Sequence, residues 1–534
     1  MFEKLTLKIS SQALYILYLL QKNNFEGYIV GGAVRDTLLN ALETKLKQQE
    51  TTYIRAKDYD FTTDAQPEEI QALFPENFYE NMFGTVGIAH KHLVEQMGQP
   101  QIITSENYNP EKNKVIDVTS ATKIHESLQT KEKSLDTQQN DTLNQPEEIY
   151  EITTFRADGH YTNHRKPDTV TWGKTLAGDL ARRDFTINAM AIQISQKFLE
   201  TIDFSQLTEN ITVDSNHYTI IDLHEGTIDL ESGIIRTVGD PNKRFTEDAL
   251  RMLRAIRFSV QLNMQIDTDT FEAIITHSEL IQHISFERIR DEFFKMLASE
   301  FPKQAIEILD ETKLLQWIIP ELLEGKGVEQ AGHHTTDVWT HNLDALESCP
   351  SQDVVVRFAT LLHDIAKPHT YKKIDGQPTF YNHEIVGSRI AKNIAKRLRL
   401  PKTDIDRVFL LVRYHMFYYQ PDHTDASIRR FMRKVGLENI NDILALREGD
   451  RLGSGARKTS WRLEEMKERM ISQLHQPFAI TDMAINGHDL MDAFQLEPGK
   501  KIGEILNTLF ETVLENPELN EKKALLKAAE KLLE

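Results

Sequence analysis

Two aspartates, Asp58 and Asp60, are separated by one residue in a run of aromatic and β-branched residues that is typical of a β-strand. Because side chains alternate along a strand, both carboxylates are expected on the same face. Two carboxylates this close repel each other unless a divalent cation lies between them, and Mg²⁺ in such a site also binds substrate phosphates. The spacing therefore predicts a catalytic site in which Asp58 and Asp60 hold one or two Mg²⁺ ions.

A glycine pair precedes these aspartates. Gly31 and Gly32 follow a predicted strand over residues 27–30 and precede a predicted helix that begins near Ala33. Glycines let the backbone approach an anion closely, the helix start directs N–H groups towards it, and Arg35 supplies a bidentate donor. Either motif alone is more often an ordinary turn or a solvated strand end, but their order along the chain favours a phosphate and metal site.

A third group is suited to recognise a base. Asp248 and Arg251 lie three residues apart in a predicted helix, on one face. For an isolated pair, a salt bridge on a solvated helix is the usual explanation. Cytosine and adenine, however, each present an amino donor beside a ring-nitrogen acceptor, so an accepting Asp and a donating Arg can pair with either base and reject guanine and uracil. The pair therefore predicts selection of C and A without a template.

A separate set of histidines and aspartates lies further along the chain. Its members are His341, His363, Asp364, His383, His415 and Asp450. A lone histidine is more often structural than a ligand, but His363 and Asp364 are adjacent in an apolar run, and burying such groups without a metal or hydrogen-bond partners is costly. The set therefore predicts a metal centre.

The elements that carry these residues change in character along the chain. Apolar spacing predicts a helix over residues 10–22. Strands are predicted over residues 27–30, 58–63, 83–90 and 149–155. Residues 91–148 are polar with few large apolar side chains, which is typical of a partly disordered surface insertion. After residue 241 the apolar spacing is helical almost to the end, so the predicted fold class is α+β, an α/β part followed by an all-α part.

Composition limits the classes of protein. The chain has 534 residues, with 62 Lys and Arg against 81 Asp and Glu, and a formal net charge of −19. This length predicts about three or four domains. The acidic balance argues against a non-specific nucleic-acid coat, although arginines crowded at 244–257 and 389–469 allow a local basic groove. The single cysteine, Cys349, fits a reducing cytoplasm, and no stretch is long and apolar enough to predict a membrane span.

The motifs occur in an order that resembles a known family. GGAVRD, DYDFTT, RRDFTINAM, DLESGIIRTVGDP and RFTEDALRMLRAIRF look like the successive motifs of the bacterial class II tRNA nucleotidyltransferase and poly(A) polymerase family, part of the polymerase-beta-like nucleotidyltransferases. The resemblance covers about residues 1–90 and 149–300. Residues 40–56 and the polar insertion depart from the family pattern and look like loop expansions that leave the site intact.

The resemblance implies roles for individual residues. It implies that Asp58 and Asp60 bind the catalytic Mg²⁺. The residues it implies for nucleotide binding are Gly31, Gly32, Arg35 and Asp36 at the triphosphate, Arg183, Asp184 and Asn188 in the motif for the ribose, and Asp248 and Arg251 at the base, helped by Arg254 and Arg257.

The second set, in the order H…HD…H…H…D, resembles the HD phosphohydrolase domain. By this resemblance the primary metal set is His341, His363, Asp364 and Asp450, with His383 and His415 available for a second ion or for phosphate. It implies a substrate such as a 2′,3′-cyclic phosphate or 2′-phosphate at a damaged RNA end. The whole chain is similar to nucleotidyltransferases with an HD domain fused behind the head.

Four domains are expected from these observations. They are a polymerase-beta-like nucleotidyltransferase head with a small mixed sheet over residues 1–240, a helical neck over 241–330, an HD domain over 331–475 and a helical tail over 476–534.

The expected activity is template-independent addition of CCA to tRNA 3′ ends from CTP and ATP. It is expected to use Mg²⁺ in the head and a divalent metal of unknown identity in the HD domain, in the cytoplasm, without a membrane or an obligatory protein partner. Alternatives within the family are a poly(A) polymerase or an enzyme that adds only A or only CC. Alternatives from other classes are an HD nucleotide hydrolase or signalling protein with a nucleotide-sensing head, and an RNA-binding scaffold. The intact Asp58 and Asp60 count against both.

Overall fold

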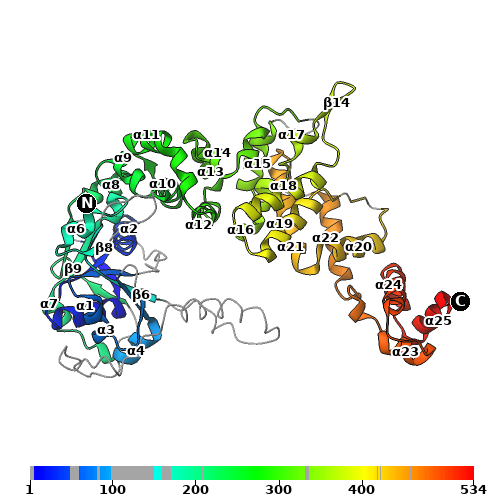
Figure 1. The fold of residues 1–534 in the computed structure, drawn as a ribbon, viewed down its shortest axis with the longest axis horizontal. Coiled ribbons are helices and arrows are strands. Elements are labelled where there is room, and N and C mark those ends of the chain that lie inside the picture. Colours follow the sequence, from blue (N-terminus) through cyan, green and yellow to red (C-terminus); the bar gives the residue numbers. More distant parts are fainter. Residues whose placement is uncertain are drawn as a thin grey trace. The chain divides into compact units, whose positions relative to one another are not determined.

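The structure is a computed structural model. The chain divides into two compact units, Met1–Ile284 and Ser285–Glu534 (Figure 1). The residues that it describes are 5–47, 59–80, 84–97, 149–158, 170–206, 210–330, 336–417, 419–420, 422–456 and 460–533. The α+β fold class is confirmed, because a mixed sheet lies in the first unit and helices dominate the second. The finer division into four domains stays a prediction.

The first unit is built on a mixed sheet. Its described strands lie in the order β11-β9-β2-β3-β6-β5-β4. Their bounds are Tyr218–Asp222, Met190–Ile194, Gly27–Val30, Asp60–Thr63, Ile149–Thr154, Thr85–Ala89 and Phe78–Glu80. β3 pairs parallel with β6 and antiparallel with β2. The predicted strands at 27–30 and 149–155 are confirmed almost to the residue, whereas β4, β9 and β11 were not predicted.

The register of β2 and β3 brings the glycine pair to the aspartate motif. Val30 pairs with Asp60, so the turn at Gly31 begins beside the start of β3. Tyr59 and Phe61 are buried and their rings stack with centroids 6.3 Å apart, which leaves Asp60 on the opposite face. Asp60 therefore has the orientation that the strand alternation predicts, while Asp58 lies outside the described residues.

The helices of the first unit correct two expectations. Its main helices are α1 Ser11–Lys22, α2 Gly32–Lys47, α3 Pro67–Leu73, α4 His90–Met97, α6 Leu176–Ala181, α8 Gly226–Ser232, α9 Pro241–Glu247, α10 Leu250–Leu262 and α11 Thr268–His277. Helix α2 continues through Lys47, so the first part of the 40–56 stretch is helix and not loop. Helix α4 buries Leu93 and Met97, so residues 91–97 belong to the fold and not to the polar insertion, whose residues 98–148 lie outside the described part.

The second unit is helical. Its main helices are α12 Phe286–Leu297, α13 Pro302–Glu311, α15 Val338–Glu347, α16 Val354–Leu362, α17 Lys367–Thr370, α18 His383–Arg397, α19 Lys402–Tyr414, α20 Asp425–Val435, α21 Ile440–Gly453 and α22 Trp461–Gln473. A short antiparallel hairpin, β14 Lys372–Ile374 and β15 Gln377–Thr379, interrupts the predicted all-α region.

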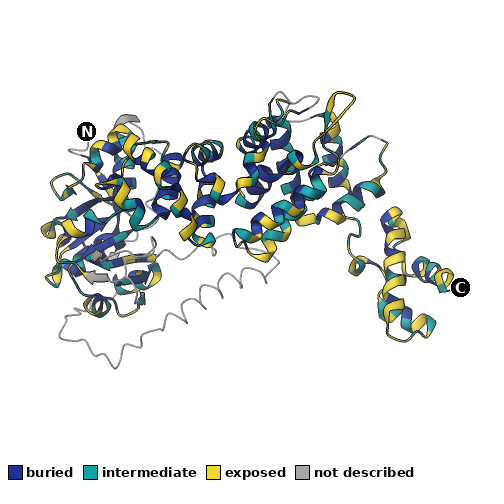
Figure 2. Cartoon of the chain, turned by 45° about the horizontal axis from the view of Figure 1, so that its top comes forward, coloured by how far each residue is buried: buried dark blue, intermediate teal, exposed yellow. Residues whose placement is uncertain are grey.

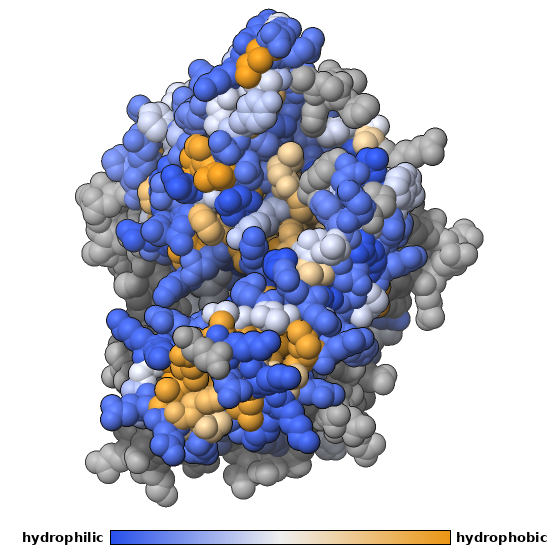
Figure 3. Space-filling view, turned by 90° about the vertical axis from the view of Figure 1, so that its right-hand side faces the viewer, coloured by the Kyte–Doolittle hydropathy of each residue, from blue (hydrophilic) through white to orange (hydrophobic). Residues whose placement is uncertain are grey.

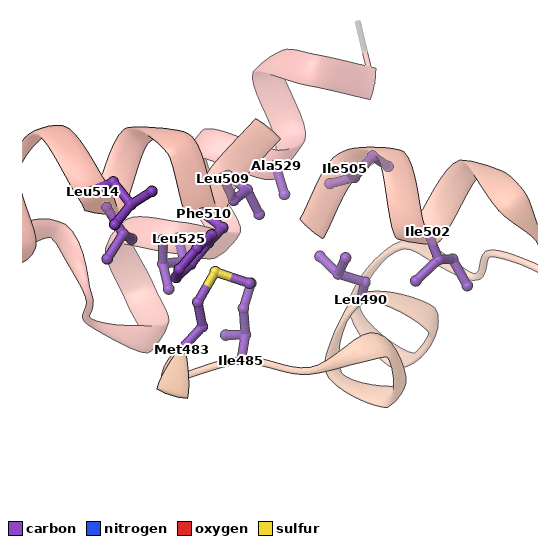
Figure 4. Close-up of a cluster of buried hydrophobic side chains, with 11 residues drawn as sticks. Met483, Ile485, Leu490, Ile502, Ile505, Leu509, Phe510, Leu514, Leu525 and Ala529 are labelled. Atoms are coloured by element: carbon purple, nitrogen blue, oxygen red, sulfur yellow. The ribbon is translucent and has the colours of Figure 1, made fainter. Parts of the chain in front are cut away.

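The end of the chain packs as a small helical layer of its own. Helices α23 Gly487–Phe494, α24 Lys500–Glu515 and α25 Lys522–Leu533 enclose an apolar cluster around Leu509 and Phe510 (Figure 4). Arg429 of α20 donates to the carbonyls of Leu514 (2.8 Å) and Glu515 (3.0 Å), the last residues of α24. A buried cation at a helix C-terminus satisfies otherwise unpaired carbonyls and attaches this layer to α20.

Burial follows the same organisation, with buried residues inside each group of helices and around the sheet (Figure 2). The face in Figure 3 is mainly hydrophilic, with separate apolar patches. Among the described residues, no helix has the length and apolar character needed to cross a bilayer.

Candidate functional site

The glycine turn, Asp60 and the motif around Arg183 meet in the first unit. Gly31 has a φ of +73°, in the left-handed region that glycine adopts without strain. A Cβ at Gly31 would lie 3.0 Å from Arg183 Nη1 and 3.1 Å from Asp60 Oδ2. The backbone of the turn therefore lies directly against a carboxylate and a guanidinium, as a site for a metal-bound phosphate requires.

Arg35 links this turn to the second motif. Its Nη1 donates to Asn188 Oδ1 at 2.8 Å, and its Nε donates to Asp36 Oδ1 at 2.7 Å. Arg183 Nη1 also reaches the carbonyl of Asn188, at 3.5 Å. The structure thus brings together residues about 150 positions apart in the sequence, as the motif order predicts.

The arginines of this region surround one aromatic ring. The guanidinium carbons of Arg35, Arg254 and Arg257 lie 5.2, 5.3 and 4.2 Å from the centroid of Phe258. An aromatic face attracts guanidinium groups and holds them in place. Phe258, which the sequence analysis did not single out, therefore positions three cations of the site. Its place in the arginine-rich run is a signal that could have revealed it.

Asp184 is the ionised partner of Arg254. Arg254 Nε donates to Asp184 Oδ2 at 2.6 Å, and the N–H of Phe185 donates to Oδ1 at 2.9 Å. Burial would raise the pKa of Asp184, but the attraction of Arg254 and, to a lesser extent, of Arg251 outweighs it and lowers this pKa to about 2. The carboxylate therefore remains charged and orients Arg254.

We expect Asp184→Asn to destabilise the first unit by about 2 kcal/mol at pH 7. Because the folded pKa lies below the unfolded value, this contribution is present above about pH 4 and is lost as the pH falls towards 2. The measurement is a urea titration of the full chain, with hydrogen exchange of peptides from the first unit as the readout. The difference in the free energy of unfolding between wild type and variant should become smaller over that pH range. A gap that stays constant with pH would contradict the charge-pair explanation.

The predicted helical position of Asp248 is wrong. Asp248 is extended (φ −139°, ψ 107°) between α9 and α10, and its Oδ1 accepts the N–H of Leu250 at 3.0 Å. Aspartate competes for backbone N–H groups and favours helix starts, which explains the break. Arg251 is on α10 as predicted, with Nη1 2.6 Å from Glu247 Oε2 and Nη2 3.1 Å from the carbonyl of Arg182. Glu247 thus positions Arg251, a role that their spacing of four residues could have indicated.

Asp179 is a second residue that the sequence analysis missed. Its side chain is fully buried and pairs with Arg182 Nη2 at 2.5 Å and with Arg183 Nη2 at 3.2 Å. Burial would raise the pKa of Asp179, but the two arginines lower it below the usual value. Asp179 therefore holds Arg183 beside Gly31.

All six histidines and aspartates of the second set converge in the second unit. Helices α15, α18 and α21 carry His341, His383 and Asp450, while the other three residues follow directly after α16 and α19. All six are buried, from 0% exposed for His341 to 8% for Asp450. A chain segment of about 110 residues is therefore folded around one polar centre.

Four of them present their ligand atoms to one point. His341 Nε2 lies 3.1 Å from His363 Nε2, 3.3 Å from Asp364 Oδ2 and 3.3 Å from Asp450 Oδ1. His363 Nε2 lies 3.2 Å from the same Asp364 oxygen. Ligands about 2.1 Å from one metal ion lie about 3.0–3.5 Å from each other in octahedral or tetrahedral geometry. His341, His363 and Asp364 therefore form a group that could hold a metal ion, with Asp450 beside it.

The other oxygen of Asp364 belongs to a second group. Asp364 Oδ1 lies 3.2 Å from His383 Nε2 and 3.7 Å from His415 Nε2, and these two nitrogens are 3.3 Å apart. Asp364 therefore has one oxygen in each group, so it could contribute a ligand atom to both.

The outer nitrogens of three of the four histidines contact main-chain carbonyls. Nδ1 of His363 lies 2.7 Å from Thr360 O, Nδ1 of His383 2.8 Å from Phe380 O, and Nδ1 of His415 2.8 Å from Val412 O. Since a carbonyl only accepts, Nδ1 carries a proton and Nε2 faces the centre. This arrangement orients imidazoles towards a metal.

The charges of the centre also favour a cation. Burial lowers the pKa of His363, but Asp364 and Asp450 outweigh burial and raise this pKa to about 10. Burial alone would raise the pKa values of Asp364 and Asp450. The neighbouring histidines and basic side chains instead hold both pKa values well below the usual value. The two buried carboxylates thus require positive charge beside them, from protons or from metal ions.

Two further cations border the centre and were not predicted as site residues. Lys367 Nζ lies 2.5 Å from Asp364 Oδ2, and Arg447 Nη1 lies 2.6 Å from Asp450 Oδ2. Each is three residues from its aspartate, a helical spacing visible in the sequence.

Comparisons with known proteins agree with this arrangement. A family model of the poly(A) polymerase head domain matches residues 27–115 and 112–236. A second family model, of the RNA- and SrmB-binding site of polymerase A, matches residues 263–325. A third, of tRNA nucleotidyltransferase domain 2, matches residues 385–529. The A-adding tRNA nucleotidyltransferase of Deinococcus radiodurans is 31% identical over 359 residues, which are 64% of this chain and 76% of that protein. The CCA-adding enzyme of Ligilactobacillus salivarius is 29% identical over 526 residues, 98% of this chain and 96% of that protein.

The fold has a solved counterpart. The crystal structure of the Bacillus stearothermophilus CCA-adding enzyme in complex with CTP aligns with a TM-score of 0.59 and 24% identity, over 97% of both chains. The motifs gather around Gly31 and Asp60, and the sequence matches the D. radiodurans enzyme. This chain therefore belongs to the tRNA nucleotidyltransferase and poly(A) polymerase family.

Proposed function

We propose that this chain adds CCA to the 3′ end of tRNA from CTP and ATP. The observation that carries the proposal is that a Cβ at Gly31 would lie 3.0 Å from Arg183 Nη1 and 3.1 Å from Asp60 Oδ2, in a chain aligned along 98% of its length with a CCA-adding enzyme. The family implies a divalent metal, for which we propose Mg²⁺ on Asp58 and Asp60. When bound, this metal lowers the pKa of the attacking hydroxyl and stabilises charge on the phosphates.

The side chains of this chain would then position the reactants. Arg35 and the backbone at Gly31 and Gly32 bind the triphosphate, so that the RNA 3′-hydroxyl attacks the α-phosphorus in line and pyrophosphate leaves. Arg183, Asp184 and Asn188 bind the ribose. For Asp248 and Arg251 we retain the proposed reading of the base, helped by Arg254 and Arg257. Glu247 orients Arg251 in this reading.

Nucleotide addition to defined tRNA transcripts tests this proposal. Transcripts ending at the discriminator base, at C or at CC are incubated with CTP and ATP, separately and together. We expect C and CC products with CTP alone, one A on the CC transcript with ATP alone, and an arrest after CCA with both. Addition of A only, as in an A-adding enzyme, or of an open-ended A tail would identify one of the family alternatives instead.

A second function is favoured by the histidine and aspartate centre. We propose that it holds one divalent ion on His341, His363, Asp364 and Asp450, and a second ion or a phosphate at His383 and His415. The distances of 3.1–3.3 Å between His341 Nε2 and its three neighbours support the first ion. A metal at this position activates water, so we propose hydrolysis of a phosphate ester such as a 2′,3′-cyclic phosphate. Lys367 and Arg447 would then neutralise charge on the two carboxylates.

The proposed location of both activities is the cytoplasm, where tRNA is processed. The single cysteine, Cys349, is buried and free, which suits a reducing compartment.

A further inference from the structure

A hairpin next to the metal centre has no role in the activities described so far. Strands β14 and β15 pair from Lys372–Thr379 to Ile374–Gln377, and the two turn residues, Asp375 and Gly376, have φ values of +49° and +78°. Positive φ at both positions is the backbone of a tight type I′ turn, which matches the twist of the strands. The hairpin is thus a defined projection, and it stands out from the helices near the α17 label in Figure 1.

Both ends of the hairpin are attached to the metal centre. It begins just after α17, which carries Lys367, and it leads into α18 at His383. Phe380, at the end of the hairpin, accepts a hydrogen bond from His383 Nδ1 at 2.8 Å through its carbonyl. The ring of Phe380 lies 5.5 Å from Lys367 Nζ and 5.7 Å from the ring of Tyr371. Anything bound along the hairpin therefore has a short path to the proposed metal ions.

The surface of the hairpin combines exposed rings with lysines. Tyr381 is 71% exposed, Ile374 45% and Tyr371 38%, and Lys372 and Lys373 are exposed beside them. In the part of the chain that the structure describes, neither lysine forms an ion pair. Exposed aromatic residues with adjacent lysines bind single-stranded nucleic acid, because bases stack on the rings while the cations meet the phosphates.

We propose that the hairpin over residues 371–381 binds single-stranded RNA and leads its 3′ end to the histidine and aspartate centre. This inference rests on the proposed metal-dependent hydrolysis and specifies its substrate class, an RNA strand with a terminal phosphate, which makes contacts with the hairpin that a free cyclic nucleotide cannot make. The reason for this substrate class is the length of the hairpin. A hairpin with arms of three residues extends about 10 Å, so its tip contacts nucleotides beyond the terminal one.

The test compares two substrates of the metal-loaded full chain. One is an RNA pentanucleotide ending in a 2′,3′-cyclic phosphate, which the head cannot extend because it has no free 3′-hydroxyl. The other is 2′,3′-cyclic AMP. The variant is Lys372→Ser/Lys373→Ser/Tyr381→Ser, and the matched control is Lys500→Ser/Lys501→Ser/Trp461→Ser, which also removes two exposed lysines and one exposed ring. We expect kcat/KM of the hairpin variant to fall about ten-fold or more for the pentanucleotide and to stay unchanged for cyclic AMP.

A second measurement does not depend on hydrolysis. A pentanucleotide with 4-thiouridine next to its terminal residue is cross-linked to the wild-type chain, and the modified peptide is identified by mass spectrometry. We expect cross-links within residues 371–381, lost in the hairpin variant and kept in the control. If neither substrate is hydrolysed, the proposed activity fails while the cross-link still decides the RNA contact.

Two results would overturn the hairpin proposal. One is cross-linking outside residues 371–381 with wild-type hydrolysis of both substrates by the hairpin variant. The other is an equal loss of both activities, which would show that the hairpin only supports the histidine and aspartate centre.

Discussion

Replacing Asp60 by alanine should lower the rate of nucleotide addition on the order of a thousand-fold, because one carboxylate ligand of a catalytic metal contributes several kcal/mol to transition-state stabilisation. Asp60 Oδ2 is the described carboxylate closest to the glycine turn, 3.1 Å from the Cβ position of Gly31. The measurement is single-turnover incorporation of CTP into a tRNA transcript that ends at the discriminator base.

The control for this prediction is an acid directly after the other end of the same strand. Asp64 is exposed, and its Oδ1 accepts the N–H of Glu26 at 2.7 Å, a bond that Asp64→Asn retains. We expect this control to keep wild-type activity and D60A to keep its thermal unfolding midpoint and tRNA affinity. Near-normal incorporation by D60A would reject Asp60 as a ligand of the catalytic metal, whereas no incorporation by the wild type would favour a nucleotide-sensing head.

Asp364→Ala should remove bound metal from the second unit. It should also lower the rate of phosphate-ester hydrolysis by at least about a hundred-fold, while addition of CCA continues. The physical reason is that one oxygen of Asp364 lies beside the Nε2 atoms of His341 and His363. The other oxygen lies beside the Nε2 atoms of His383 and His415. Metal content by mass spectrometry and hydrolysis of 2′,3′-cyclic AMP check the prediction.

A second variant separates metal loss from misfolding. His415→Gln removes a ligand atom of one group only, so we expect it to retain the ion at His341 and His363. The matched control is His369→Gln, an exposed histidine bonded to Glu324 at 3.0 Å, which should bind metal as the wild type does. Equal metal content in the wild type and D364A would refute a metal role for this centre.

Several features could be predicted because they depend on short stretches of sequence. The strand at Gly27–Val30, the glycine turn and the helix after it follow from local rules of chain geometry. The alternation that places Asp60 opposite Tyr59 and Phe61 is equally local. Asp248 marks the limit of such rules, since its spacing from Arg251 suggests a continuous helix while its side chain satisfies the N–H of Leu250 instead.

The order and types of the chemical groups were thus readable from the residues, both in the glycine and aspartate motifs and in the histidine set. Their mutual distances were not, because contacts between segments far apart depend on packing. The approach of Arg35 to Phe258, the hydrogen bond from Arg156 N to the buried Asp179, and the two oxygens of Asp364 shared between two pairs of imidazoles each join residues on different elements. Such contacts form only when apolar faces, and not sequence neighbours, set where the helices and strands lie.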